Sequence, residues 1–245
     1  MTSDRVNTDS FPTALAAAVG RSLEGRALLT HPFYQRWEAG RLELSELAEY
    51  AVHYRAFEAA LPVVLAAVVD RLRHEGDLEA AAMVERNLAD EVGHPRPHLD
   101  LFDRFAEAVP VAAVATGPGL AADRLVDTYA DLVADGPVAA LAGLAAYESQ
   151  AAAIAGSKAD GLRRWYGMGP AGTEFWDVHA EMDADHGDWT LEALALRDAD
   201  PSEVARAARR GADAWWALLD EREAEARAQP SSVPTTETKD TISPG

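Results

Sequence analysis

Residues 143–156 read GLAAYESQAAAIAG, a stretch that is small and apolar on nearly every face of a helix. Pro137 stands upstream where proline suits the first turn of a helix, which we expect to run to about Ala159. The whole chain is rich in alanine and only 7% aromatic, which favours close-packed helices over a β-sandwich. The stretch therefore predicts a core helix of an all-α protein.

Helical patterns also fill the chain on both sides of this stretch, separated by short breaks at glycine and proline. We find no strand or hairpin signal and no internal repeat. We predict one all-α domain over residues 11–227, a bundle of about seven helices, with a flexible N-terminus at 1–10 and a disordered Pro/Ser/Thr-rich tail at 228–245. The other expected helices cover 11–29, 44–73 with a kink at Pro62, 78–92, 98–109, 120–134, 173–197 and 201–227.

Charge and composition exclude several classes of function. The net charge of −19 argues against a nucleic-acid partner and against an anionic membrane surface. The absence of cysteine excludes disulfides, thiolate metal sites and cysteine nucleophiles. The first residues lack the pattern of a secretory signal, and the apolar run Leu61–Val69 is far short of a membrane span. We expect a cytoplasmic location.

Three polar residues, His179, Asp183 and His186, follow one another at i, i+4 and i+7. On a helix these positions share one face, so two imidazoles and a carboxylate could ligate a metal. Ligation by nitrogen and oxygen without sulfur suits iron or manganese. The alternative is a solvated polar face, because FWDVHAEMDADHGDW contains other acidic residues as well.

Two further patterns add to this stripe. Glu91 and His98 are also seven residues apart, but they flank the break GHPRP, so helical geometry cannot be assumed between them. Glu148 is a lone carboxylate in the apolar helix described above, where burial is costly unless the group is paired or bound to metal. It could instead be a surface glutamate, although few positions around it look exposed. Together the six residues are the inventory of a dinuclear carboxylate-bridged site in a helical bundle.

With these residues in place, the sequence resembles the haem-oxygenase-like (TenA/PqqC-like) dinuclear metal oxidases. Within that group it is most similar to the CADD family (Chlamydia protein associating with death domains), whose members act as 4-aminobenzoate synthases. The resemblance runs from about His31 to Leu194 and includes HPFYQRWEAGRL, DEVGHPRPHLDLF and YESQAAAIAGSK. The family's metal-ligand pattern matches at all six positions, Glu91, His98, Glu148, His179, Asp183 and His186.

The resemblance also implies a particular reaction. Members of the family are understood to make 4-aminobenzoate, a folate precursor, from one of their own tyrosines, with a lysine as amino donor. The sacrificed tyrosine would be Tyr34 and the donor Lys158, with Tyr147 as a radical relay. The implied cofactors are two metal ions, Fe/Fe or Fe/Mn, which use dioxygen and an external reductant. From the residues alone, Tyr34 and Tyr147 would be core aromatics and Lys158 a solvated helix-end charge.

Other functions stay open at this point. Relatives with the same six ligands oxidise or cleave free amino acids or fatty acids, so a small-molecule substrate is the alternative to self-processing. A haem oxygenase would need a proximal histidine, for which His31 is the candidate, but six ligand-spaced residues would then be unexplained. A non-enzymatic binding or regulatory module is the alternative of another class. A homodimer is neither required nor excluded.

Overall fold

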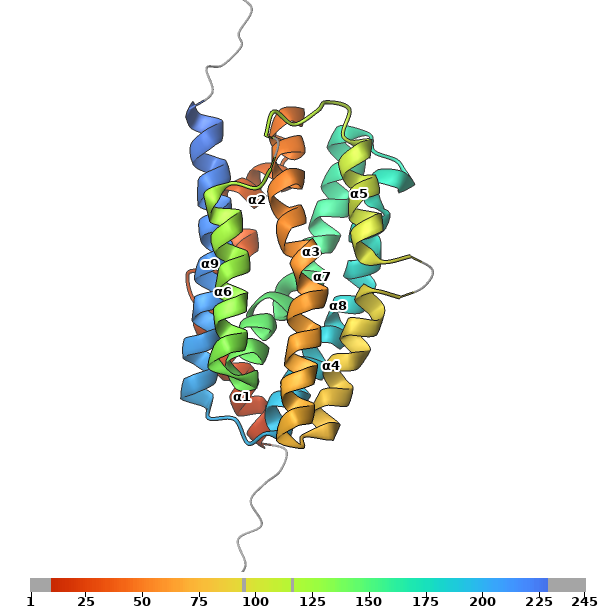
Figure 1. Cartoon of the computed structure of the whole chain (residues 1–245). Coiled ribbons are helices and arrows are strands. Elements are labelled where there is room, and N and C mark those ends of the chain that lie inside the picture. The colour runs from red at the N-terminus through yellow and green to blue at the C-terminus, as the bar shows by residue number, and fades with distance from the viewer. Residues whose placement is uncertain (1–9, 94–95, 116, 229–245) are drawn as a thin grey trace, which may run out of the picture.

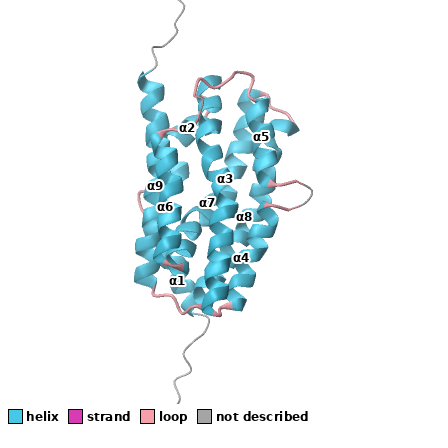
Figure 2. Cartoon of the chain, viewed as in Figure 1, coloured by secondary structure: helices cyan, strands magenta, loops and turns pink. Residues whose placement is uncertain are grey.

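The computed structural model describes residues 10–93, 96–115 and 117–228. Within these ranges all regular structure is helical, with nine α-helices, one short 3-10 turn and no strand (Figure 2). The all-α prediction is thereby confirmed. The elements are α1 (Ser10–Ser22), η1 (Leu28–Thr30), α2 (Pro32–Glu38), α3 (Leu44–Glu75), α4 (Leu78–Glu91), α5 (His98–Ala108), α6 (Leu120–Asp135), α7 (Pro137–Tyr166), α8 (Pro170–Leu196) and α9 (Pro201–Ala228).

The expected ranges account for eight of the nine α-helices in the described residues, and the ninth, α2, is too short to show a periodicity. It begins at a local signal instead, with His31 as N-cap and Pro32 in the first turn. Helix α1 ends at Ser22 rather than near residue 29, and the chain turns at Gly25 with φ +69°. Helix α7 runs on to Tyr166 rather than ending near residue 159. The predicted flexible segments 1–10 and 228–245 lie outside the described residues, except for the helical ends Ser10 and Ala228.

The helices run roughly along one common axis (Figure 1). Helices α6 and α9 lie side by side on one flank. On the other flank, α4 and α5 follow one another end to end and pack against both α3 and α8. Helix α7 packs against α8, α9 and α6, which makes it the central helix of the bundle. The break between α4 and α5 thus falls midway along the bundle, beside α8.

Helices α3 and α7 are long and apolar enough to span a membrane by length and composition alone. In the bundle, 50% of the most apolar 18-residue segment of α3 is buried, and 67% of the corresponding segment of α7. Their apolar character is therefore used in packing against other helices. In α7, small side chains such as Ala139, Ala140, Ala142 and Ala146 are buried, and they allow neighbouring helices to approach closely.

Two glycines face one another where α9 packs on α7. A Cβ added to Gly211 would lie 3.0 Å from the carbonyl oxygen of Gly143 and 3.2 Å from its Cα. Both are backbone atoms of a central helix and cannot move aside easily. We predict that Gly211→Ala lowers the stability by about 1–2 kcal/mol, because overpacking outweighs the gain of about 1 kcal/mol in helix propensity.

Gly156→Ala is the matched control, since a Cβ there would meet no atom within 4 Å. It should raise the stability by up to about 1 kcal/mol. Thermal melts of the two variants should therefore shift in opposite directions, by a few degrees each. Equal melting temperatures of Gly211→Ala and Gly156→Ala would show that α7 and α9 leave room for a methyl group at position 211.

Candidate metal centre

The break between α4 and α5 brings Glu91 and His98 together. Glu91 is the last residue of α4 and His98 the first residue of α5. A Cβ at Gly93 would collide with the carbonyl oxygen of Ala89, so glycine permits the chain to leave α4 there. Both side chains are 3% exposed, and Nδ1 of His98 lies 3.1 Å from Oε2 of Glu91. Glu91 and His98 therefore lie close together because the chain leaves α4 between them, and not because seven residues make two turns of one helix.

The stripe on α8 follows the helical periodicity that the sequence indicates. His179, Asp183 and His186 are all buried. Nδ1 of His186 lies 3.5 Å from Oδ1 of Asp183. The His179 ring lies 4.4 Å, centroid to centroid, from the ring of His98 on α5. The stripe and the α4–α5 break thus face one another.

Glu148 reaches the same place from α7, where it is 8% exposed. Two neutral donors hold its carboxylate: Nδ2 of Asn87 donates to Oε1 at 2.7 Å, and Oγ1 of Thr190 donates to Oε2 at 2.5 Å. Burial raises the pKa of Glu148 to about 7, although the hydrogen bond from Thr190, nearby His186 and the bond from Asn87 act in the opposite direction. Each oxygen keeps a further lone pair, so the Glu148 carboxylate could still bind a metal ion through both oxygens.

Hydrogen bonds also orient the two histidines of α8. Nδ1 of His179 lies 2.8 Å from the carbonyl oxygen of Phe175 and must carry the proton there, which leaves Nε2 as the ligand atom. Nε2 of His186 lies 3.1 Å from Oδ2 of Asp90, which leaves Nδ1 as its ligand atom. Partners of this kind fix the tautomer of metal-binding histidines.

The buried polar atoms fit a metal ion. Oε2 of Glu91 and Nδ1 of His98 are 3.1 Å apart, yet their geometry is not that of a hydrogen bond, and neither atom has a hydrogen-bond partner among the described residues. Adjacent ligands at 2.0–2.2 Å from one ion lie about 3 Å apart, so a shared cation would satisfy both. One ligand atom each from Glu58, Glu91, His98 and His179 lies within 4.8 Å of the others.

A small cavity connects this cluster with the rest of the predicted ligand set. Its volume is about 20 Å³, which leaves room for a water-sized molecule. The structure thus brings all six predicted residues together, and their role as ligands stays a prediction. His98 does not line the cavity, although its ring contacts that of His179. The other five line it: Glu91, Glu148, His179, Asp183 and His186.

Glu58 on α3 is a residue of this site that the sequence reasoning missed. Its side chain is 2% exposed and lines the same cavity. A signal was present, because Glu58 follows Tyr54 by four residues and Tyr50 by eight, on a face that these tyrosines bury. Helical periodicity therefore places a carboxylate on an apolar face, the criterion that also singled out Glu148.

The charged groups in the cluster shift one another's pKa values. Burial raises the pKa of Glu58 well above its ordinary value, and the carboxylates of Glu91 and Asp183 raise it further. Burial also raises the pKa of Glu91, but His98 and the two histidines of α8 lower it on balance. Burial lowers the pKa of His186, while Asp183 and neighbouring glutamates raise it to about 9 overall. A metal cation would relieve this excess of buried carboxylates.

Lys158 lies in a cage of aromatic rings. Its side chain is 2% exposed, and Nζ donates a hydrogen bond to Oη of Tyr50 at 2.6 Å. Nζ lies 4.5 Å from the centre of the Tyr34 ring and 4.2 Å from that of Trp176. Oη of Tyr34 is itself 2.8 Å from Oη of Tyr50. Lys158 is therefore a buried amine packed against Tyr34, and not the solvated helix-end charge of the simplest interpretation.

Tyr147 lies next to Glu148 on α7 and lines the metal-site cavity. Its Oη is 2.5 Å from Oη of Tyr54. Its ring stacks on that of Trp215, with centroids 4.3 Å apart and an interplanar angle of 15°. Burial raises the pKa of Tyr147 well above its ordinary value, so it is a neutral phenol.

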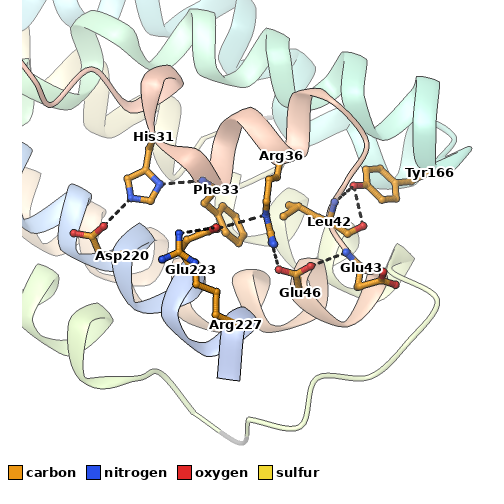
Figure 3. A network of polar contacts seen from close by, with 10 residues as sticks. All are labelled: His31, Phe33, Arg36, Leu42, Glu43, Glu46, Tyr166, Asp220, Glu223 and Arg227. Carbon is orange, nitrogen blue, oxygen red and sulfur yellow. Dashed lines mark hydrogen bonds and ion pairs between the residues drawn. The ribbon is translucent and has the colours of Figure 1, made fainter. Parts of the chain in front are cut away.

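Helix α2, which carries Tyr34, is held in place by polar contacts on its outer side (Figure 3). Arg36 forms ion pairs with Glu46 of α3 and Glu223 of α9. Just after α2, the backbone N–H and carbonyl of Leu42 both bond to Oη of Tyr166, at 3.1 Å each. The ion pairs of Arg36 thus tie α2, and with it Tyr34, to α3 and α9, while Tyr166 holds only the turn after α2.

His31 belongs to the same network and is not free to bind haem (Figure 3). Its Nδ1 accepts a hydrogen bond from the backbone N–H of Phe33 at 3.1 Å. Its Nε2 lies 3.1 Å from Oδ1 of Asp220. Both ring nitrogens are therefore occupied, and His31 acts as the N-cap of α2 rather than as a proximal ligand.

Comparison with known proteins agrees with this fold and site. Residues 48–217 match the model of a family described as an iron-containing redox enzyme. The fold is also that of solved structures: a CADD-like protein of unknown function from Nostoc punctiforme has a TM-score of 0.73 at 18% identity, covering 89% of this chain and 98% of that one. A TenA homolog from Pseudomonas syringae has a TM-score of 0.70 at 16% identity, covering 91% and 98%.

The chain thus belongs to the haem-oxygenase-like family of iron-containing redox enzymes. Among its relatives are 4-aminobenzoate synthases. That of Nitrosomonas europaea is 35% identical over 212 residues, covering 81% of this chain and 86% of the relative. That of Chlamydia pneumoniae is 31% identical over 216 residues, covering 84% and 94%. The resemblance noted from the sequence is confirmed.

Proposed function

We propose that this protein is a dioxygen-activating, non-haem dinuclear iron or Fe/Mn oxygenase that makes 4-aminobenzoate from its own Tyr34, with Lys158 as amino donor. The observation that carries this proposal is the position of Nζ of Lys158, 4.5 Å from the centre of the buried Tyr34 ring. The named activity of the relatives, 4-aminobenzoate synthase, supports it.

The metals would be held by the six residues of the predicted ligand set, whose buried nitrogen and oxygen atoms suit iron or manganese. Bound metal, with dioxygen and an external reductant, would supply the oxidising power that no side chain has. The protein's own contribution is to place an amine beside the residue to be oxidised and to exclude water from both. The excess of carboxylates and the unpaired atoms of Glu91 and His98 support such a metal centre.

The surroundings of Lys158 suit an amino donor. Burial lowers the pKa of Lys158 well below its ordinary value, against the opposing effect of Glu58 and Asp183. An amine that loses its proton readily has a lone pair available for bond formation. The aromatic rings around Nζ shield it from water, and the Tyr50 hydroxyl contacts both Nζ and the hydroxyl of Tyr34, which holds the two groups near one another.

A series of aromatic contacts connects the metal-site cavity with Tyr34, which supports a relay role for Tyr147. Tyr147 contacts Tyr54 through their hydroxyls, and the rings of Tyr54 and Tyr50 have centroids 5.5 Å apart. The rings of Tyr50 and Tyr34 follow at 6.1 Å. If the six predicted ligands hold metal, this series of rings would connect that centre with Tyr34 and could carry an oxidising equivalent to it.

The small cavity favours self-processing over the alternative of a free amino-acid or fatty-acid substrate. A space of about 20 Å³ admits dioxygen or water but no amino acid. Tyr34 and Lys158, the two side chains that would react in self-processing, are in contrast already buried next to one another.

Isotope labelling tests the proposal directly. Protein grown with lysine labelled with ¹⁵N at Nζ, loaded with iron and given reductant and dioxygen but no organic substrate, should release ¹⁵N-labelled 4-aminobenzoate. The yield should not exceed about one product per chain, because Tyr34 is consumed. Mass spectrometry of product and protein measures both.

The sequence contains two lysines, Lys158 and Lys239, which supply a matched pair of variants. Lys158→Arg keeps the charge but lacks a readily deprotonated amine, so it should release no labelled product. Lys239→Arg should behave like the wild type. Repeated turnover of an added amino acid or fatty acid with Tyr34 intact would instead favour the alternative function.

A further inference from the structure

We propose that Glu58 is a seventh protein ligand of the metal centre, contributed by α3 and binding the ion held by Glu91 and His98. This inference rests on the proposed function, since it concerns the same metal centre. The six ligands of the family pattern come from α4, α5, α7 and α8. Glu58 would add a fourth carboxylate from a helix that supplies none of them.

The carboxylate of Glu58 is buried and incompletely paired. The side chain is 2% exposed, and Oε1 is buried with no hydrogen-bond partner in the part of the chain that the structure describes. A buried carboxylate with an unpaired oxygen is costly unless a cation is nearby. Glu148 and Glu49, two other buried glutamates, show the contrast, because side-chain or backbone donors bond to both oxygens of each.

Glu58 lies near two side chains that also carry an unpaired polar atom. A carboxylate oxygen of Glu58 lies within 4.8 Å of ligand atoms of Glu91, His98 and His179. Among the described residues, Oε2 of Glu91 and Nδ1 of His98 also lack hydrogen-bond partners. Three neighbouring side chains, each with an unpaired polar atom, thus bring ligand atoms into one small volume. A single cation satisfies all three, whereas a water molecule has only two hydrogens to donate.

The position of Glu58 also suggests why a further carboxylate would be useful here. Glu58 and Asp183 are the two acidic groups whose charges act on Lys158. As a metal ligand, Glu58 would share its negative charge with the ion. Its charge would then favour the protonated form of Lys158 less strongly. Metal loading and the availability of the amine would then be coupled through one side chain.

Metal titration of Glu58→Gln tests the assignment. Wild-type apo protein should bind two Fe(II) ions per chain anaerobically, and Mn(II) provides a second probe. Glu58→Gln should bind at least one ion about tenfold or more weakly, because loss of a partner of a ligand alone costs 10–100-fold. The apo variant should melt no lower than apo wild type, since a neutral amide of the same size replaces a carboxyl group whose charged form is costly to bury. Its gain in melting temperature on metal loading should be smaller.

Glu49→Gln is the matched control, a buried glutamate on the same helix whose carboxylate binds backbone N–H groups of Val114 and Ala115. It should lower the apo melting temperature and leave the metal affinity unchanged. Glu58→Asp, which withdraws the carboxylate by one methylene group, is a second variant and should also weaken metal binding.

The outcomes separate this inference from the proposed function. Two ions bound equally tightly by wild type, Glu58→Gln and Glu58→Asp would overturn the role of Glu58 and leave the metal centre intact. A wild-type protein that binds neither iron nor manganese would overturn both.

Discussion

Tyr34→Phe should reduce 4-aminobenzoate formation to below detection, the largest loss of activity that we expect from a single substitution. Phenylalanine keeps the ring beside Lys158 but lacks the oxygen on the ring carbon that the proposed reaction aminates. The metal ligands are untouched, so dioxygen uptake with reductant should stay measurable. Chromatography with mass detection of the product, alongside an oxygen electrode, separates these two effects.

The packing cost of this substitution should be small. Within the described residues, Oη of Tyr34 forms a hydrogen bond only with Oη of Tyr50, and loss of one such bond costs about 1 kcal/mol. Tyr166→Phe is a suitable control, because it removes a hydroxyl that binds the backbone of Leu42 and does not reach Lys158. It should retain full product yield. Product from Tyr34→Phe at the wild-type level would show that another residue or a free substrate supplies the ring.

Glu148→Ala should have the largest effect on metal binding. Glu148 is the one predicted ligand from the central helix α7, and both its oxygens are already oriented by Asn87 and Thr190. We expect the affinity for iron to fall by at least about 100-fold, because losing a ligand should exceed the 10–100-fold cost of losing its hydrogen-bonding partner. Metal analysis of the purified protein and anaerobic titration of the apo protein measure this.

The helical fold should survive Glu148→Ala. The substitution leaves two buried donors without their acceptor, at about 1–3 kcal/mol each, but it also removes a buried carboxylate. Circular dichroism should therefore show unchanged helix content with a modest change in melting temperature. His74→Ala is the control, since His74 is exposed in the last turn of α3. Equal iron content in the two variants would contradict the assignment of Glu148 as a ligand.

Several features of this protein could be predicted from sequence because they depend on local geometry. An alanine-rich apolar stretch such as 143–156 predicts a buried helix, and α7 is one. His179, Asp183 and His186 share a face because a helix is rigid and its period is known. Their spacing in the sequence was therefore sufficient to predict that they lie together. The break after Glu91 was also predictable, since glycine and proline restrict the backbone at their own positions.

Only the tertiary structure decided which distant residues meet. Nothing in the local sequence indicates that Lys158 of α7 packs on Tyr34 of α2, or that Tyr50 of α3 bonds to both. Glu58 became part of the site in the same way, because burial and unpaired oxygens arise from the packing of α3 against neighbouring helices. Helical periodicity determines which face of a helix is buried, whereas the contacts made by that face depend on every helix packed against it.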